Sequence, residues 1–348
     1  MRMRRSLPII VVVLLVAAAV ALLVVLRKHA PPEPARLLPG ADGFVYINLQ
    51  WMRRANILGE LPAVPHDPEY EQFIQATGFQ FERDLDEAAF AVHYPSKSAQ
   101  VSQLRFSEVF VGKIHGERLR AYLAKLSSSS ENYRSVDIYS IPLEGRTVRV
   151  AILGLDTVAA SNTDNPQVIR GIIDRSRKLA SPFGGPALLR QYYKHVPFAS
   201  LAWAIFRVDP SAEFFKSGPG WSAWFSQPAV LLASIRYLRE LHFRGVAFTA
   251  SEQDAKNVVD RAATYLDLFH AAEISTGAQG QDADVRALFD SLKVEQQKDH
   301  AVLTATVPAG FVRKALAEAP AAVGPEATPA QGPGIVPPAE KRKSTTPH

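Results

Sequence analysis

Three aromatic residues, Trp221, Trp224 and Phe225, are the side chains best suited to contact a ligand. They lie within Ser217–Pro228, where glycine and proline on either side indicate a loop. Rings on an exposed loop stack on sugars, grip a peptide or enter a membrane interface. Alternatively, the same rings fold back as a lid on the protein core. The sequence leaves both interpretations open, and the segment is its one candidate binding loop.

No motif for catalysis or for a cofactor accompanies these rings. The sequence lacks the G-x-S-x-G turn of many hydrolases, the phosphate-binding and dinucleotide-binding glycine loops, and the H-E-x-x-H zinc motif. It has no cysteine, which excludes thiol nucleophiles, disulfides and cysteine-based metal centres. Its nine histidines show no ligand spacing. We therefore predict a non-enzymatic protein without cofactor or metal; a metal site built from distant histidines is the alternative.

Two charged patterns have a functional and a structural interpretation. The acidic residues of segment 82–87 could bind Ca²⁺, but the segment lacks the glycine of a calcium loop and contains Arg83. We expect a solvated turn there. Two Asp-Arg pairs recur on predicted helices and are interpreted either as a repeated functional pair or as surface polar residues: Asp174-Arg175 and Asp260-Arg261.

The distribution of charge argues against binding to nucleic acid. The chain has 39 basic and 34 acidic residues. Residues 1–30 hold five of the basic residues and no acid, and residues 318–348 hold three of each sign. The body between them is therefore balanced, with 31 of each. A nucleic-acid-binding domain would show a basic face within its fold.

The segment Leu7–Leu26 predicts a membrane-spanning helix. Its twenty residues include no charged side chain, and a helix of this length is about 30 Å long, enough to cross the hydrocarbon core of a bilayer. The A-x-A sequence at 19–21 lies inside the apolar run instead of after it. We expect an uncleaved signal anchor over residues 1–29; a cleaved signal peptide and a buried core helix are the alternatives.

The basic residues around this segment predict its orientation. The amino terminus and three arginines precede it, and two basic residues follow it directly: Arg2, Arg4, Arg5, then Arg27 and Lys28. The slight excess before the segment favours a cytoplasmic N-terminus. The prediction is a single-pass membrane protein whose bulk is extracytoplasmic, on the periplasmic or outer side.

Changes in composition divide the rest of the chain. Residues 30–40 are proline-rich and predict an extended stem. A first half over 41–180 and a second over 199–317 follow, joined by a connector at 181–198 that begins with glycine and proline. The Pro/Ala-rich tail 318–348 buries too little apolar area to fold and is expected to be disordered.

Alternating and helical patterns predict an α+β fold. We expect an antiparallel-sheet-dominated body in two similar halves, with helices packed on the sheets. Two pairs of segments resemble each other, by duplication or by convergence of apolar period and capping: Phe110–Leu123 with Leu303–Leu316, and Asn165–Arg175 with Ser251–Arg261. The apolar run Val230–Leu238 is ambiguous. Asp67 as the cap, Pro68 at the first position and Gly78 as the stop predict a helix over 69–77. Strands are expected at 43–49, 105–114 and 133–141, with a loop at 127–130.

The opening of the body, LPGADGFVYIN at 38–48, together with the anchor and the stem, resembles a loose group of signal-anchored bacterial extracytoplasmic α+β proteins of unknown function. The resemblance implies no catalytic residue. The sequence thus predicts a binding or interaction module of the cell envelope, held in the membrane by residues 7–26, with an envelope protein or a glycan as partner. An assembly factor for a membrane complex and an enzyme with an unrecognised site are the alternatives.

Overall fold

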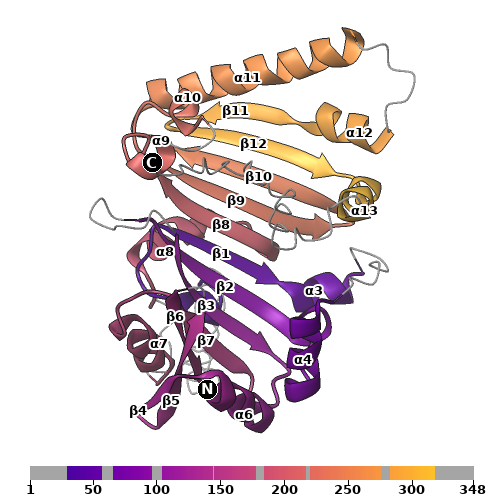
Figure 1. The fold of residues 1–348 in the computed structure, drawn as a ribbon. Coiled ribbons are helices and arrows are strands. Elements are labelled where there is room, and N and C mark those ends of the chain that lie inside the picture. Colours follow the sequence, from indigo (N-terminus) through magenta and orange to yellow (C-terminus); the bar gives the residue numbers. More distant parts are fainter. Residues whose placement is uncertain are drawn as a thin grey trace, which may run out of the picture.

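The structure, a computed structural model, describes residues 30–56, 66–95, 104–143, 145–177, 184–216, 220–275 and 283–317. A twelve-stranded sheet runs through these residues, every neighbouring pair of strands is antiparallel, and helices pack on it (Figure 1). The predicted α+β class with a large antiparallel sheet is therefore confirmed.

The strands follow the order β11-β12-β10-β9-β8-β1-β2-β3-β7-β6-β5-β4 across the sheet. The N-terminal strands are β1 (Gly43–Asn48), β2 (Leu85–His93), β3 (Arg105–Gly112), β4 (Ser129–Tyr133), β5 (Val136–Leu143), β6 (Arg146–Ile152) and β7 (Thr157–Ser161). The C-terminal strands are β8 (Ser200–Val208), β9 (Ala229–Leu238), β10 (Glu240–Phe248), β11 (Lys293–Gln297) and β12 (His300–Val307).

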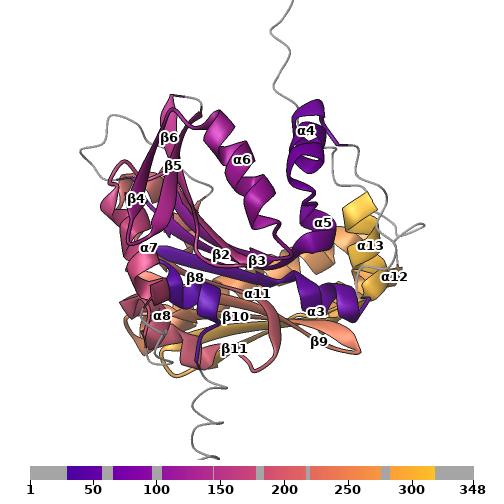
Figure 2. The same ribbon diagram turned by 90° about the horizontal axis from the view of Figure 1, so that it is seen from below.

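Helices connect the strands. Those before β8 are α2 (Glu33–Leu37), α3 (Leu49–Arg54), α4 (Pro68–Thr77), α5 (Phe81–Asp84), α6 (Gly116–Leu126), α7 (Gln167–Arg177), α8 (Ala187–Tyr192) and the 3₁₀ helix η1 (Tyr193–His195). Those after β8 are α9 (Glu213–Lys216), α10 (Trp221–Trp224), α11 (Glu252–Ser275), α12 (Ala283–Ser291) and α13 (Ala309–Ala317). Helices α4 and α6 rise from one side of the sheet, whereas α7 and α8 lie at the other (Figure 2).

The N-terminal and C-terminal strands join through β1 and β8, which pair in the middle of the sheet. From this junction, each set of strands continues as a three-strand meander, β1-β2-β3 or β8-β9-β10, and a later strand then returns beside the third. The segments that resemble each other in sequence do not occupy equivalent places. Phe110–Leu123 begins in β3, the third strand from the junction, whereas Leu303–Leu316 begins in β12, the fourth.

The main core lies on one face of the sheet. Strand alternation places Phe44 and Tyr46 of β1 on this face, opposite Ile205 and Trp203 of β8, and all four are at most 4% exposed. Helices α7 and α8 cover this face with fully or almost fully buried residues: Ile169, Ile172, Ile173, Leu188 and Leu189. The apolar faces of these helices and of the strands therefore pack together in one core.

Residues 33–38 differ from the extended stem that the sequence predicts. They form helix α2 and its C-cap, and Ala35, Leu37 and Leu38 are at most 3% exposed. Pro34 fits within the first turn of a helix, where its missing N–H costs no hydrogen bond. Burial of these three apolar side chains against the main core outweighs the preference of a proline-rich segment for extended backbone.

The structure of one further segment differs from the prediction, and that of another segment decides an ambiguous one. Residues 129–143 form a hairpin, β4 and β5, instead of a loop and one strand, because Arg134 and Ser135 both adopt positive φ, at 51° and 62°. Such tight turns usually contain asparagine or glycine, so the sequence gives no turn signal there. The ambiguous run 230–238 lies in strand β9, paired on both sides.

In the part of the chain that the structure describes, no helix is both long enough and apolar enough to cross a membrane. The predicted anchor over residues 1–29 and the predicted tail over 318–348 lie outside that part.

Candidate functional site

Phe225, the last of the three predicted binding residues, belongs to the core. It is 6% exposed and lies in a cluster with Phe215, Ala247 and Val258, beneath helix α11. A ring that is already surrounded by the protein offers little surface to a partner. Its position agrees with the lid alternative.

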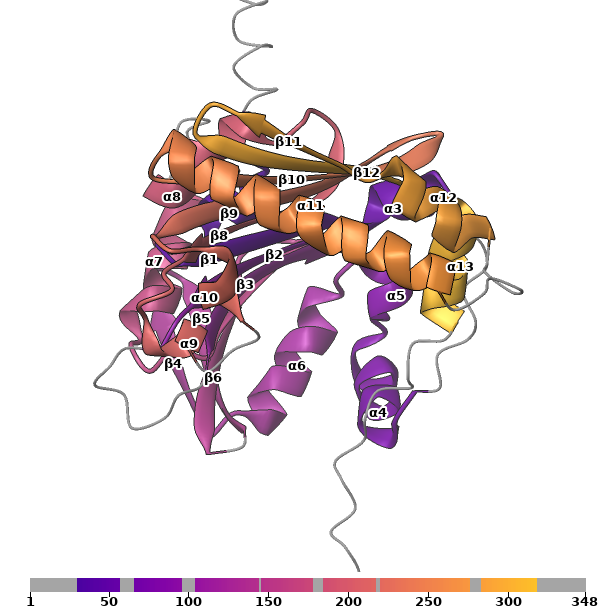
Figure 3. The ribbon, with the colours of Figure 1, turned by 90° about the horizontal axis from the view of Figure 1, so that it is seen from above.

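Trp224 lies at the edge of the same cluster, in helix α10. Its half-buried ring stacks on Tyr265 of α11, with 5.0 Å between ring centroids. Arg261 of α11 donates a hydrogen bond to the carbonyl oxygen of Ala223, which holds α10 beside the first half of α11 (Figure 3). The Trp221 side chain lies outside the described atoms. The two described rings of this segment, Trp224 and Phe225, thus pack on the protein itself.

The arginines of the two Asp-Arg pairs share a structural role. Arg175 donates from Nε to the carbonyl oxygen of Leu37 at 2.6 Å and so fastens α7 to α2. Burial lowers the pKa of Arg175. Because Arg261 similarly holds Ala223 of α10, each arginine binds the main chain of another helix. They are anchors and not simply surface polar residues.

The acidic segment 82–87 does not form a cation site, because its carboxylates have separate protein partners. Asp84 is 5% exposed and binds Arg83, whose hydrogen bonds hold the pKa of Asp84 below its usual range. The other three bind hydroxyl or guanidinium donors: Glu82 with Tyr70, Asp86 with Arg53, and Glu87 with Tyr46. Burial raises the pKa of Glu87. The expected solvated turn is wrong for Asp84. Among the described residues, no three metal-ligating side chains gather at one place.

The feature best suited to bind a ligand is an apolar cavity between α4, α6 and the sheet. Its volume is about 180 Å³. The lining comes from α4 and α5 with their connection, from α6 and the residues before it, and from β3, β6 and β7: Phe73, Thr77, Phe79, Phe81, Phe110, Ile114, His115, Leu119, Leu123, Val150, Val158 and Ala160. We call it the α4–α6 pocket.

Helix α4 forms one wall because the local sequence fixes both of its ends. The Asp67 carboxylate accepts a hydrogen bond from the Tyr70 N–H at 2.7 Å, and Pro68 occupies the first turn. Gly78 ends the helix with φ of 73°, a conformation that suits glycine. The sequence predicted this helix from the same residues, and the prediction is confirmed.

Aromatic rings form much of the pocket wall. Phe73 of α4 stacks on Phe81 of α5 with 5.7 Å between centroids and an angle of 10°. Phe79 meets Phe81 edge to face at 5.3 Å, and Tyr122 of α6 meets Phe73 at 5.5 Å. Phe81 remains 41% exposed. The pocket wall therefore includes one exposed aromatic ring, Phe81, beside buried lining residues such as Val158, which is 8% exposed.

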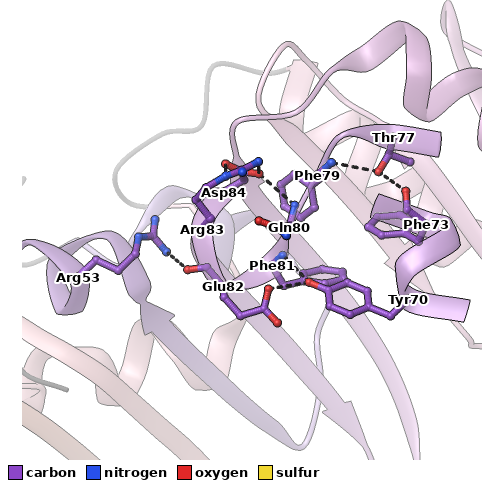
Figure 4. A network of polar contacts seen from close by, with 10 residues as sticks. All are labelled: Arg53, Tyr70, Phe73, Thr77, Phe79, Gln80, Phe81, Glu82, Arg83 and Asp84. Atoms are coloured by element: carbon purple, nitrogen blue, oxygen red, sulfur yellow. Dashed lines mark hydrogen bonds and ion pairs between the residues drawn. The ribbon is translucent and has the colours of Figure 1, made fainter. Parts of the chain in front are cut away.

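Hydrogen bonds hold this wall in place (Figure 4). The Tyr70 hydroxyl donates to Glu82 at 2.7 Å and accepts from the Phe81 N–H at 2.8 Å, so it ties α4 to α5. Burial and the bond to Glu82 raise the pKa of Tyr70 to about 12. The Thr77 hydroxyl is also engaged, with the Phe73 carbonyl and the Phe79 N–H. The hydroxyl groups of Tyr70 and Thr77 are thus hydrogen-bonded within the wall.

The lining favours binding over catalysis. Only Thr77 and His115 contribute polar side chains to it, and the Thr77 hydroxyl already has two backbone partners. General acid–base or nucleophilic chemistry needs paired groups within hydrogen-bond reach of the reacting atoms. What the pocket can do is remove an apolar group from water, which is worth about 25 cal/mol per Å² of apolar surface.

One carboxyl group, that of Glu108 on β3, lies beside this pocket on the same sheet face. In the strand register, Glu108 lies opposite Phe90 of β2 and opposite Ala160 of β7, and Ala160 lines the pocket. In the described part of the chain it has no hydrogen-bond or ion-pair partner. Burial raises the pKa of Glu108, because the charged form is poorly solvated there.

Glu108→Gln is expected to stabilise the protein at neutral pH and to do so less in acid. Since the folded state raises this pKa, the carboxyl favours folding when protonated, and this contribution is lost as pH rises through the raised pKa. The measurement is the difference in Tm between variant and native protein from pH 4 to pH 8, about the range over which a raised glutamate pKa is found. Glu117→Gln is the control, because Glu117 is an exposed residue of α6. Equal gains from both variants would show that net charge is responsible.

Sequence comparison adds no relative to these observations: no protein-family model matches the chain, and no curated protein matches it. Similar solved structures include three crystal forms of TP0453, each 10% identical in sequence. Form IV has a TM-score of 0.43 and the match covers 82% of this chain and 96% of that one. Forms III and I have TM-scores of 0.40 and 0.41 and cover 82% of this chain and 97% of the other. Scores this low carry no argument.

Proposed function

We propose that this protein is a non-catalytic binding module that takes a single hydrocarbon chain of a membrane component into the α4–α6 pocket. The observation that carries the proposal is the lining, which is apolar apart from Thr77 and His115. A glycan would need hydrogen-bond donors and acceptors that this lining lacks. An apolar chain needs none.

The location that the sequence predicts supports this choice of ligand. Residues 7–26 have the length and composition of a membrane anchor, and an extracytoplasmic body attached to it would remain beside lipid. Helix α2 packs directly on the sheet, so little chain separates that anchor from the folded body. We infer that the pocket works close to a bilayer surface.

A photoactivatable fatty acid with a diazirine at its terminal carbon tests the proposal in membranes that contain the full chain. We expect cross-links to peptides of α4 and α6. Ala160→Phe should fill the pocket and reduce these cross-links by about tenfold, the effect of losing about 1.4 kcal/mol of binding energy. The fold should persist, since the ring enters existing space.

Ala233→Phe is the matched control. Ala233 lies on the same sheet face in β9, outside the pocket, in a row of paired residues that runs through Val45 and Glu108 to Ala160. Its cross-linking pattern should equal that of the native protein. Cross-links confined to the predicted anchor, or unchanged by Ala160→Phe, would contradict the proposal.

A further inference from the structure

A second cavity, of about 450 Å³, lies between η1 and the C-terminal strands and is lined by basic side chains. It is on the sheet face opposite to the α4–α6 pocket, because Arg244 connects by strand pairing through Ser234 and Trp203 to Tyr46 in the main core. Six of its lining residues are basic and none is acidic: Lys194, His195, Arg236, His242, Arg244 and Lys293. We call it the basic cavity.

Strand register gathers these side chains from separate parts of the sequence. Arg244 on β10 lies between Ser234 on β9 and Thr304 on β12, and Thr304 in turn pairs with Lys293 on β11. His242 lies two residues further along β10, at the next position on this face, between Arg236 and Thr306. Two rows of basic and hydroxyl side chains therefore lie side by side on one face.

Arg244 is the unusual member of this group. Its Nε is buried and has no hydrogen-bond partner among the described atoms. The neighbouring Ser234 hydroxyl donates to the Arg244 carbonyl oxygen at 3.3 Å, so it does not satisfy the guanidinium. A buried donor without an acceptor is costly, and more so when it is charged. Because this Nε is closed to solvent, a ligand in the cavity would meet the terminal nitrogens of the Arg244 guanidinium.

The charges around the cavity leave a positive field within it. Burial, and then the positive charges of Lys194, His300 and Arg244, lower the pKa of His195. Glu295 of β11 shares this sheet face and pairs with Val302, two residues from Thr304. Lys293 and Glu295 are both exposed, but only Lys293 lines the cavity. No carboxylate of the lining neutralises Arg244, so the field favours an anion.

We propose that the basic cavity binds a phosphate group, with Arg244 and Lys293 as its charged ligands. A guanidinium presents a planar fork that matches two phosphate oxygens, and an ammonium adds a second point of charge. The Thr304 hydroxyl can supply a neutral hydrogen bond, whereas the Thr306 hydroxyl is 3.4 Å from His242 Nδ1. The volume of the cavity leaves room for what the phosphate is attached to. This site is independent of the α4–α6 pocket.

Calorimetric titration of the full chain in a non-ionic detergent and chloride buffer tests the site. Two probes separate the sources of the phosphate group: inorganic phosphate, and glycerophosphoglycerol, the headgroup of phosphatidylglycerol without its chains. We expect at least one to bind. Tighter binding of inorganic phosphate would assign the site to free phosphate, and tighter binding of glycerophosphoglycerol to a lipid headgroup.

Arg244→Gln and Lys293→Gln should each weaken the tighter probe by about tenfold or more, as expected for the loss of a charge-assisted hydrogen bond. Lys256→Gln removes an equal charge from α11, where Lys256 pairs with Asp260, and should leave binding unchanged. Without phosphate, Arg244→Gln should have a Tm no lower than that of the native protein, because the buried unpartnered donor is gone.

Three results would overturn the proposal. Neither probe binds the native protein; or binding survives both substitutions in the cavity; or Arg244→Gln lowers the Tm strongly in phosphate-free buffer, which would show that the arginine is a structural element of the sheet. A failure here would leave the fatty-acid cross-linking experiment unaffected, since the two sites share no lining residue.

Discussion

Trp203→Ala is expected to lower the free energy of unfolding by about 3–5 kcal/mol, the usual loss for a buried large aromatic side chain. Trp203 is 2% exposed and lies on β8, in the middle of the sheet. Its ring stacks on Tyr46 of β1 at 5.6 Å and meets Tyr193 of η1 edge to face at 5.3 Å. Truncation would open a cavity at the junction of the N-terminal and C-terminal strands.

Trp203→Phe is the matched control for this experiment. The indole Nε1 is buried without an acceptor among the described atoms, so a phenyl ring keeps aromatic contact and gives up no hydrogen bond. We expect a loss of under about 1.5 kcal/mol. Urea denaturation followed by far-ultraviolet circular dichroism measures both variants. Similar losses for alanine and phenylalanine would mean that the indole itself, and not ring packing, stabilises the junction.

The second large effect is expected for Phe225→Ala, at about 3–5 kcal/mol. Phe225 is 6% exposed in the cluster that joins α9, α10 and α11 to the sheet. The same denaturation experiment applies. The result distinguishes the lid from the binding loop, because a ring that gripped a partner would be exposed and its loss would cost the free protein little.

Leu268→Ala serves as the reference for a surface position. Leu268 lies on α11 and is 60% exposed, so its truncation should change stability by less than about 0.5 kcal/mol. Phe225→Ala must be far more destabilising than this control. A loss within the range of the Leu268 variant would return Phe225 to the list of candidate binding residues.

The sequence was most informative where local chemistry decides structure. Asp67, Pro68 and Gly78 predicted the ends of α4 because caps act within a few residues. Strands were also predicted at 43–49 and 105–114, where β1 and β3 lie. The β4–β5 hairpin was missed because Arg134 and Ser135 adopt positive φ without the usual turn residues. Helix α2 was missed because its stability comes from burial against distant strands.

Neither proposed site could be predicted from short sequence patterns. The α4–α6 pocket joins Phe73 to Ala160, and the basic cavity joins Lys194 to Thr306, across pairings that no short pattern specifies. A signal for the pocket does exist in the dense run of phenylalanines between 73 and 110. The basic cavity left no trace in net charge, since the body is balanced. In contrast, the conspicuous aromatic segment 221–225 contributes Phe225 to the core.

The strand order has a consequence for crowding at a membrane, the location that we propose for this protein. A sheet of twelve strands has two edges, here β4 and β11. An edge exposes unpaired backbone groups that can recruit a strand from another copy, and chains concentrated on one surface meet often. Both edges are only five residues long and rich in polar side chains, SSENY in β4 and KVEQQ in β11. Such short polar edges disfavour strand-to-strand pairing between copies of the chain.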